Sequence, residues 1–221
     1  MTDLSEAIDS IALRIHERFS GRHRAREQAL PLSREAIRHS ANAIRAIHRH
    51  DEPAARTQLS LARDKTEAAR AALAEHPEIL YAGFVHDAQK EFAEASLTIA
   101  LIAGEPLPDP IDLGVEDAAY LNGLGESVGE LRRYLLDSLR HGDINACEQL
   151  LQVMDDLYAL LVTIDYPDAI TGGLRRTTDV ARGILEKTRG DLTVAARQYE
   201  LERRMSEYQS ALMSLDVRQP G

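Results

Sequence analysis

The chain has 221 residues, and 44% of them are hydrophobic, which is enough for a folded core. Aromatic residues make up only 5% and Trp is absent, a composition typical of packed helices that argues against a sheet-based fold. The formal net charge of −10 argues against a protein that binds polyanions over its whole surface, and the single cysteine, Cys147, excludes an internal disulfide and a paired-thiol metal site.

No signal-peptide pattern is present, and no apolar run approaches the roughly 20 residues that a membrane span needs. We therefore expect a soluble cytoplasmic protein with no membrane partner. The connections between the expected helices are short, so we expect a single all-α domain over residues 1–221, with a frayed tail from about 214–221.

The first expected helix covers residues 4–49, where apolar residues recur at helical spacing. Gly21 and Pro31 interrupt this pattern. Because proline removes an amide donor and clashes with the preceding turn, we predict a kink or a break between about residues 20 and 31.

Six further helices are expected, separated by Pro and Gly residues and, at Asp51 and Asp143, preceded by a favourable N-cap residue. They cover about residues 52–75, 78–103, 116–140 and 144–164, then a helix that follows Gly173 and ends near Arg189, and a last one over about 191–213. Seven helices with short connections predict a helical bundle.

Positive charge is concentrated near the N-terminus. Residues 11–50 contain nine Arg against three Glu, so this segment carries +6 and the remainder −16. Such a basic element is either a track for nucleic acid, a solvated helix face or a contact between subunits, and charge by itself does not decide among them.

Two pairs of glutamates lie on expected helices. Glu91 and Glu94 are three residues apart, and Glu126 and Glu130 are four apart, so each pair shares one side of its helix. Carboxylates at these spacings can share a hard cation such as Mg²⁺, although a solvated polar face has the same spacing.

The helix of the second pair contains three glycines at positions 123, 125 and 129. Each glycine in a helix interior costs about 0.5–1 kcal/mol relative to alanine. We therefore expect something to approach this helix closely, whether a neighbouring helix, a second subunit or a ligand.

Four long runs, in matching order, resemble the translin family and identify the chain as similar to an archaeal member. They are REQALPLSREAIRHSANAIRAIHR (26–49), HPEILYAGFVHDAQKEFAEA (76–95), AAYLNGLGESVGELRRYLLD (118–137) and DYPDAITGGLRRTTDVARGILEKTRGDLT (165–193). The resemblance implies a seven-helix bundle that assembles into a hollow shell, expected to be a homo-octamer.

The family has two branches. Translin binds single-stranded RNA or DNA without cleaving it, and its relative Trax is a Mg²⁺-dependent endoribonuclease. The resemblance favours the Trax branch, because Lys90-Glu91-Phe92-Ala93-Glu94-Ala95 keeps both acids of the Trax pattern, and Glu126 and Glu130 fall where Trax has Asp and Glu. It implies that Glu91, Glu94 and Glu126 hold Mg²⁺, or Mn²⁺ in its place, and that Glu130 is a fourth catalytic residue.

An acidic metal site needs cations nearby to hold single-stranded RNA, or single-stranded DNA, against charge repulsion. The candidates for this role are Arg22, Arg24, Arg26, Lys90, Arg132 and Arg133. Tyr81, Phe84 and Phe92 are expected in the core and not as base-stacking platforms, and Cys147 is expected to be a small buried residue. The alternatives to a nuclease are a non-catalytic single-strand binder and a helical scaffold whose acids serve subunit contacts.

Overall fold

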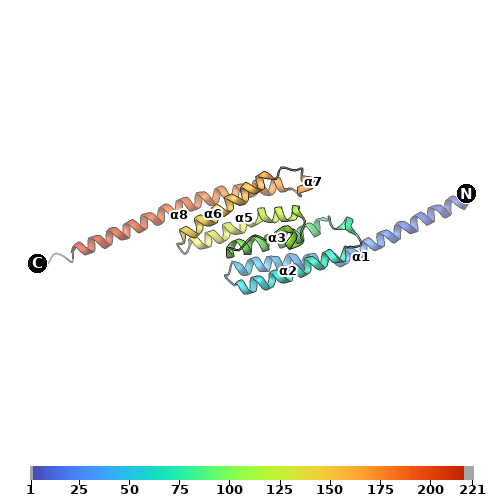
Figure 1. Cartoon of the computed structure of the whole chain (residues 1–221), viewed down its shortest axis with the longest axis horizontal. Coiled ribbons are helices and arrows are strands. Elements are labelled where there is room, and N and C mark those ends of the chain that lie inside the picture. Colours follow the sequence, from blue (N-terminus) through green and yellow to red (C-terminus); the bar gives the residue numbers. More distant parts are fainter. Residues whose placement is uncertain (1, 217–221) are drawn as a thin grey trace. The chain divides into compact units, whose positions relative to one another are not determined.

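The computed structural model describes residues 2–216, which form helices and connections and contain no strand (Figure 1). The elements in chain order are α1 (Thr2–Ile47), α2 (Glu52–Ala72), the 3₁₀ turn η1 (Pro77–Ile79), α3 (Gly83–Ala103), α4 (Pro110–Leu113), α5 (Asp117–Leu139), α6 (Ile144–Thr163), α7 (Asp168–Thr171) and α8 (Leu174–Asp216). The predicted all-α class is therefore confirmed. None of the described helices combines the length and apolar character that a membrane span needs.

The chain forms two compact units. Unit 1 contains the chain up to Ser127 together with Tyr166–Leu174, and unit 2 contains Val128–Asp165 together with the chain from Arg175 onward. Helix α5 begins in unit 1 and ends in unit 2. The single domain expected from the sequence stays a prediction.

Helices α1 and α2 of unit 1 pack along a seam of small residues. Three buried alanines on each helix repeat at intervals of seven, and they are Ala29, Ala36 and Ala43 on α1 and Ala55, Ala62 and Ala69 on α2. A seven-residue repeat keeps one side of a helix turned toward its neighbour, and small side chains let the two backbones come close. Helix α3 packs against both, with Ala95 and Ile99 contributing to a core cluster around Ile44 and Ile47.

Helix α1 continues through Pro31, so a break between residues 20 and 31 is excluded, whereas the kink that the sequence offered as the other outcome stays a prediction. Pro31 is exposed, whereas Ala29 and Ser33 on either side are buried. Proline is tolerated at this position because its ring faces solvent while buried residues on either side anchor the packed side of the helix.

The N-caps of α2 and α6 were predicted correctly. Asp51 accepts a hydrogen bond from the amide of Ala54, and Asp143 accepts one from the amide of Ala146, each at 3.1 Å. Helix α3 begins at Gly83, five residues later than expected, since the chain after Pro77 forms η1 and a turn first. It ends at Ala103, and the next residue, Gly104, has a φ of 68°, the left-handed conformation that glycine adopts easily.

Helix α8 of unit 2 continues through Gly190, where the sequence predicted a helix end. Side-chain contacts on both sides of this glycine hold the helix together: Arg189 pairs with Asp155 of α6, and Asp191 pairs with Arg132 of α5 at 2.6 Å. Thr188 and Leu192 are buried on either side of this glycine, so packing as well as these pairs favours a continuous helix over a break. The expected frayed tail is helical as far as Asp216, and its last five residues lie outside the described part of the chain.

Candidate functional site

The first two carboxylates of the site come from α3. Glu91 and Glu94 lie one turn apart on the same side of this helix, with the side chain of Glu91 28% exposed and Glu94 buried at 9%. Their neighbours Phe92 and Ala93 are fully buried in the core. The two acids therefore stand at the edge of the core and are not part of a solvated surface.

The third carboxylate, Glu126, comes from α5, and Gly123 brings it to α3. A Cβ atom at Gly123 would lie 2.7 Å from the carbonyl oxygen of Lys90 and 2.8 Å from the amide nitrogen of Glu94, closer than such atoms approach one another. The backbones of α3 and α5 therefore meet at this glycine. Glu126 follows three residues later, and its side chain is 37% exposed. Of the partners left open by the sequence, the neighbouring helix is the one that approaches Gly123.

The three carboxylates form a cluster. One oxygen from each of Glu91, Glu94 and Glu126 lies within 4.8 Å of the others, and no other group of three His, Cys, Asp or Glu within the described chain is this close. Oxygens bound to one Mg²⁺ at 2.0–2.1 Å are at most about 4.2 Å apart, so a small movement of flexible side chains would suffice. Three hard oxygen donors fit a divalent cation such as Mg²⁺ or Mn²⁺.

Lys90 lies directly against this cluster. Its Nζ atom is 2.7 Å from both Oε1 and Oε2 of Glu126 and 3.5 Å from Oε1 of Glu91. Burial acts to lower the pKa of the Lys90 ammonium, but the hydrogen bond to Glu126 and the charges of Glu126, Glu91 and Glu94 together outweigh it, so the pKa lies above its ordinary value. Burial raises the pKa of the Glu91 carboxyl, and the charge of Lys90 only partly opposes this effect.

Glu130, the fourth predicted catalytic residue, is not a member of the cluster. It lies one turn after Glu126 on α5, in unit 2, and its carboxylate is 4.0 Å from Nη1 of Arg133. The sequence placed it correctly on the same helix as Glu126, and its catalytic role remains a prediction.

The other cations predicted to hold RNA have different surroundings. Arg22 pairs with Glu78 at 2.6 Å, the guanidinium of Arg26 lies 5.9 Å from the centre of the Phe84 ring, and Arg24 is exposed.

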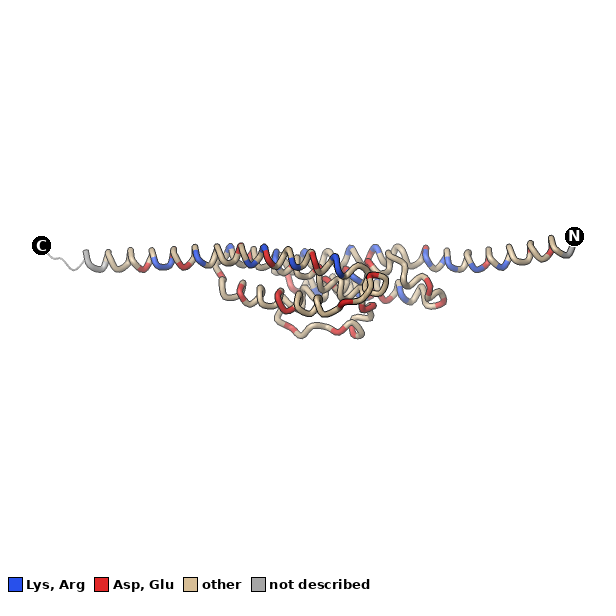
Figure 2. The backbone as a smooth tube through the Cα atoms, turned by 90° about the horizontal axis from the view of Figure 1, so that it is seen from above, with Lys and Arg blue, Asp and Glu red and all other residues tan. Residues whose placement is uncertain are grey.

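In unit 2, Arg132 is only 16% exposed, pairs with Asp191 and donates to Thr188 at 2.9 Å. Arg132 thus acts within the fold, whereas the α1 arginines lie on a helix that Figure 2 shows with basic residues along much of its length.

The predicted core positions are confirmed in part. Phe92 is fully buried and Phe84 is half-buried, but Tyr81 is 76% exposed, because it lies in the turn before α3 and not on the helix itself. Cys147 is fully buried, as expected.

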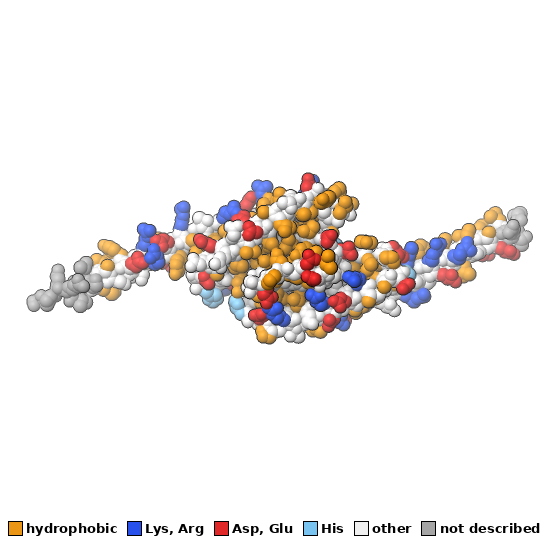
Figure 3. All heavy atoms as spheres, in the orientation of Figure 1, with side chains coloured by type: hydrophobic (Ala, Val, Ile, Leu, Met, Phe, Trp, Pro, Cys, Tyr) orange, Lys and Arg blue, Asp and Glu red, His pale blue; other side chains and the backbone are white. Residues whose placement is uncertain are grey.

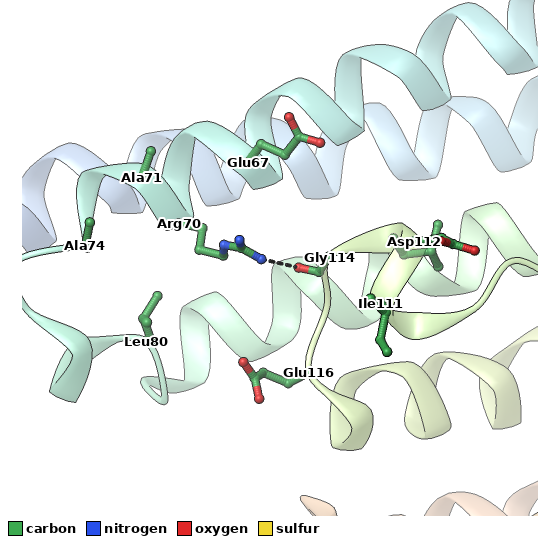
Figure 4. Close-up of a pocket in the computed structure, with 10 residues that line it drawn as sticks. Glu67, Arg70, Ala71, Ala74, Leu80, Ile111, Asp112, Gly114 and Glu116 are labelled. Atoms are coloured by element: carbon green, nitrogen blue, oxygen red, sulfur yellow. Dashed lines mark hydrogen bonds between the residues drawn. The ribbon is translucent and has the colours of Figure 1, made fainter.

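A separate hollow of about 690 Å³ lies in unit 1 between α2 and the connection that contains α4 (Figure 4). Arg70 extends from α2 toward Gly114 and donates a hydrogen bond of 3.4 Å to its carbonyl oxygen (Figure 4). Glu67, Asp112 and Glu116 line the hollow but do not gather into a cluster of possible metal ligands. The carboxylate cluster is therefore the stronger candidate site.

Sequence reasoning missed the contact between Lys90 and Glu126, which are 36 residues apart. It considered Lys90 only as an RNA ligand. A lysine directly before two site acids was a visible signal, but its partner depends on how closely α3 and α5 approach each other.

No family model matches the chain. The uncharacterized protein MJ0175 of Methanocaldococcus jannaschii is 32% identical over 189 residues, which cover 85% of this chain and 83% of that protein.

Three solved structures are similar in fold. AfC3PO in complex with duplex RNA has a TM-score of 0.76 and 36% identity, covering 87% of this chain and 97% of that one. A second AfC3PO structure has a TM-score of 0.75 and 37% identity, and the match covers 87% of this chain and 98% of that one. Apo-NeC3PO has a TM-score of 0.74 and covers 82% of this chain and 95% of that one. Its sequence identity of 21% shows a shared fold alone.

Proposed function

The chain belongs to the translin/Trax family, and from this premise we propose that it is a metal-dependent endoribonuclease that cleaves single-stranded RNA. The observation that carries the proposal is the cluster of Glu91, Glu94 and Glu126. A protein that only binds nucleic acid has no need of three carboxylates at the edge of its core, because they repel phosphate.

The chain's own residues would supply a site for Mg²⁺ or Mn²⁺. Glu91 and Glu94 of α3 and Glu126 of α5 would hold the cation, and Glu130 would orient water or a ligand. A bound divalent cation lowers the pKa of its water and offsets charge that grows on the phosphate oxygens. In the hydrolysis, the oxygen of water joins phosphorus, one P–O bond of the chain breaks, and the leaving oxygen takes up a proton.

The proposed substrate is nucleic acid, and the AfC3PO complex with duplex RNA supports this class. Arg22, Arg24 and Arg26 of α1 are the proposed contacts to the RNA backbone, because they lie on a basic helix of the same unit as the cluster. Arg132 is a weaker candidate because it is only 16% exposed and pairs with Asp191, and Arg133 is weaker because it lies in unit 2, whereas the cluster lies in unit 1.

We also propose that the chain acts as a cytoplasmic homo-oligomer, an octameric shell. The first part of α1 and the last part of α8 carry apolar side chains that this chain leaves exposed (Figure 3). On α1, Leu4, Ile8, Ile11 and Ile15 are 68%, 56%, 49% and 38% exposed, and their spacing places them in one stripe. A second copy of the chain would remove this stripe from water.

The test is cleavage of an end-labelled single-stranded RNA, and of a duplex of the same length, by the purified chain in Mg²⁺, Mn²⁺ or EDTA. Glu94→Gln keeps the shape of the side chain but removes its charge, so it should abolish cation-dependent cleavage of the single strand. Glu67→Gln is the matched control, because Glu67 is an exposed acid of unit 1 outside the cluster. An intact oligomer that binds the RNA without cleaving it would contradict the nuclease proposal and favour a non-catalytic binder.

A further inference from the structure

The ammonium of Lys90 engages the same carboxylate oxygens that the proposed metal site requires. Its Nζ atom lies 2.7 Å from each of the two carboxylate oxygens of Glu126, so neither oxygen is left without a contact to the ammonium. A further contact of 3.5 Å reaches Oε1 of Glu91, the second acid of the cluster. Lys90 therefore neutralises part of the cluster's charge from within the chain.

This arrangement conflicts with a divalent cation held by the same acid. If Glu126 ligated a cation at about 2.1 Å while Lys90 kept its present contact, the two positive centres would lie within about 5 Å of each other. The site is partly shielded from solvent, since the side chains of Lys90, Glu91 and Glu126 are 20%, 28% and 37% exposed. Like charges repel more strongly there than in water.

We propose that Lys90 is a built-in competitor of the divalent cation: its ammonium pairs with Glu126 and must leave this carboxylate before Glu126 can join Glu91 and Glu94 as a metal ligand. The inference rests on the proposed function, because it assumes that the cluster binds metal. Lysine is suited to such an exchange, since its long stem lets the ammonium move several ångströms without any change in the backbone.

A different role for Lys90 predicts the opposite result. If the ammonium held Glu126 in position for metal binding, removing it would weaken cation affinity, as the loss of a positioning contact does. If Lys90 competes, removing it strengthens cation affinity. The sign of the change therefore distinguishes the two roles.

The experiment measures the affinity of the full chain for Mn²⁺ alone, by isothermal titration calorimetry, in the wild type and three variants. Lys90→Met keeps an unbranched apolar stem of similar size but removes the ammonium, and Lys90→Arg keeps the charge. Lys65→Met is the matched control, because Lys65 also forms a close pair with a glutamate of unit 1, Glu35 at 2.6 Å, away from the cluster. Circular dichroism confirms that each variant is folded.

We expect Lys90→Met to bind Mn²⁺ at least about tenfold more tightly than the wild type, the order of one hydrogen bond between charged groups. Lys90→Arg should bind less tightly than Lys90→Met, and Lys65→Met should match the wild type. Unchanged or weaker binding by folded Lys90→Met would overturn the competitor role while leaving the metal site intact. If neither the wild type nor Lys90→Met binds Mn²⁺, both the competitor role and the proposed metal site are wrong.

A second measurement follows the lysine itself. An amine-acetylating reagent is applied with and without saturating Mn²⁺, and mass spectrometry compares labelling of Lys90 with labelling of Lys65 in the same chain. Release of the ammonium predicts that Mn²⁺ speeds acetylation of Lys90 and leaves that of Lys65 unchanged. A Lys90 labelling rate that Mn²⁺ does not raise would overturn the exchange.

Discussion

Gly123 of α5 lies so close to Lys90 of α3 that a Cβ atom on it would be 2.7 Å from the Lys90 carbonyl oxygen. The contact joins the two helices that carry the site: it reaches the backbone of Glu94 and lies one turn before Glu126. Because backbone atoms are on both sides of this contact, neither helix can yield by a simple change of side-chain rotamer.

Gly123→Ala should therefore destabilise the protein by about 1–3 kcal/mol, although alanine favours helix over glycine. Gly183→Ala is the control, because a Cβ at Gly183 of α8 would meet no atom within 4 Å apart from its chain neighbours and its own helix backbone, and it should leave the stability unchanged or raise it by up to about 1 kcal/mol. Urea denaturation measures both. A Gly123→Ala variant as stable as the wild type would show that the helices separate at little cost.

Lys90→Met should also destabilise the protein in EDTA, by on the order of 1 kcal/mol, because it leaves the carboxylates of Glu91, Glu94 and Glu126 to repel one another. Saturating Mn²⁺ should recover the lost free energy of unfolding, since a bound cation stabilises the folded state. Urea denaturation in EDTA and in Mn²⁺ tests this. Equal losses in the two conditions would contradict the electrostatic explanation.

The buried thiol of Cys147 provides a prediction about reactivity. Burial, with a smaller contribution from Asp143, raises the pKa of Cys147 from 9.0 to about 11, and its Sγ donates to the carbonyl oxygen of Leu135 at 3.4 Å. At pH 8 the thiolate fraction is then about a hundredfold lower than in the unfolded chain. Iodoacetamide should alkylate the folded protein at least that much more slowly than the urea-unfolded protein. Comparable rates would show that the thiol is accessible.

The same shift makes stability depend on pH in the alkaline range. Because the folded pKa is raised, the folded state holds the proton more tightly than the unfolded state. The protonated Cys147 thiol therefore contributes to the free energy of unfolding. This contribution is fully present below about pH 9 and is lost as the pH rises toward about 11. The stability difference between the wild type and Cys147→Ala should therefore shrink between pH 8 and pH 11 in urea titrations. A constant difference would argue against the shift.

Assembly should depend on the apolar stripe at the start of α1. Ile11→Glu places a charge in this stripe and should lower the molecular mass measured by light scattering after size exclusion. Leu13→Glu is the matched control: it alters a residue of the same helix that is 63% exposed and lies about 200° away around the helix axis. If both variants keep the wild-type mass, the stripe does not form the subunit contact.

Much of the fold was readable from the sequence because its determinants are local. Helical spacing of apolar residues predicted the long helices, and the N-caps Asp51 and Asp143 lie where expected, since a cap depends on residues only three positions away. The helix breaks considered at Pro31 and predicted at Gly190 do not occur, for the complementary reason. Packing of α1, and the pairs that Arg189 and Asp191 form with other helices, hold those helices continuous against the local preference.

The candidate site also has one part that the local sequence predicts and one part that depends on tertiary packing. The sequence by itself determined that Glu91 and Glu94 share one side of a helix, because their spacing matches the helical repeat. The family resemblance implied that Glu126 belongs with them, but the spacing did not. Only the tertiary structure brings Glu126 beside them and Lys90 against it, since both depend on the approach of α3 and α5 at Gly123. The sequence shows that a glycine permits close approach, but which backbone fills the space is decided by the packing of residues far apart in the chain.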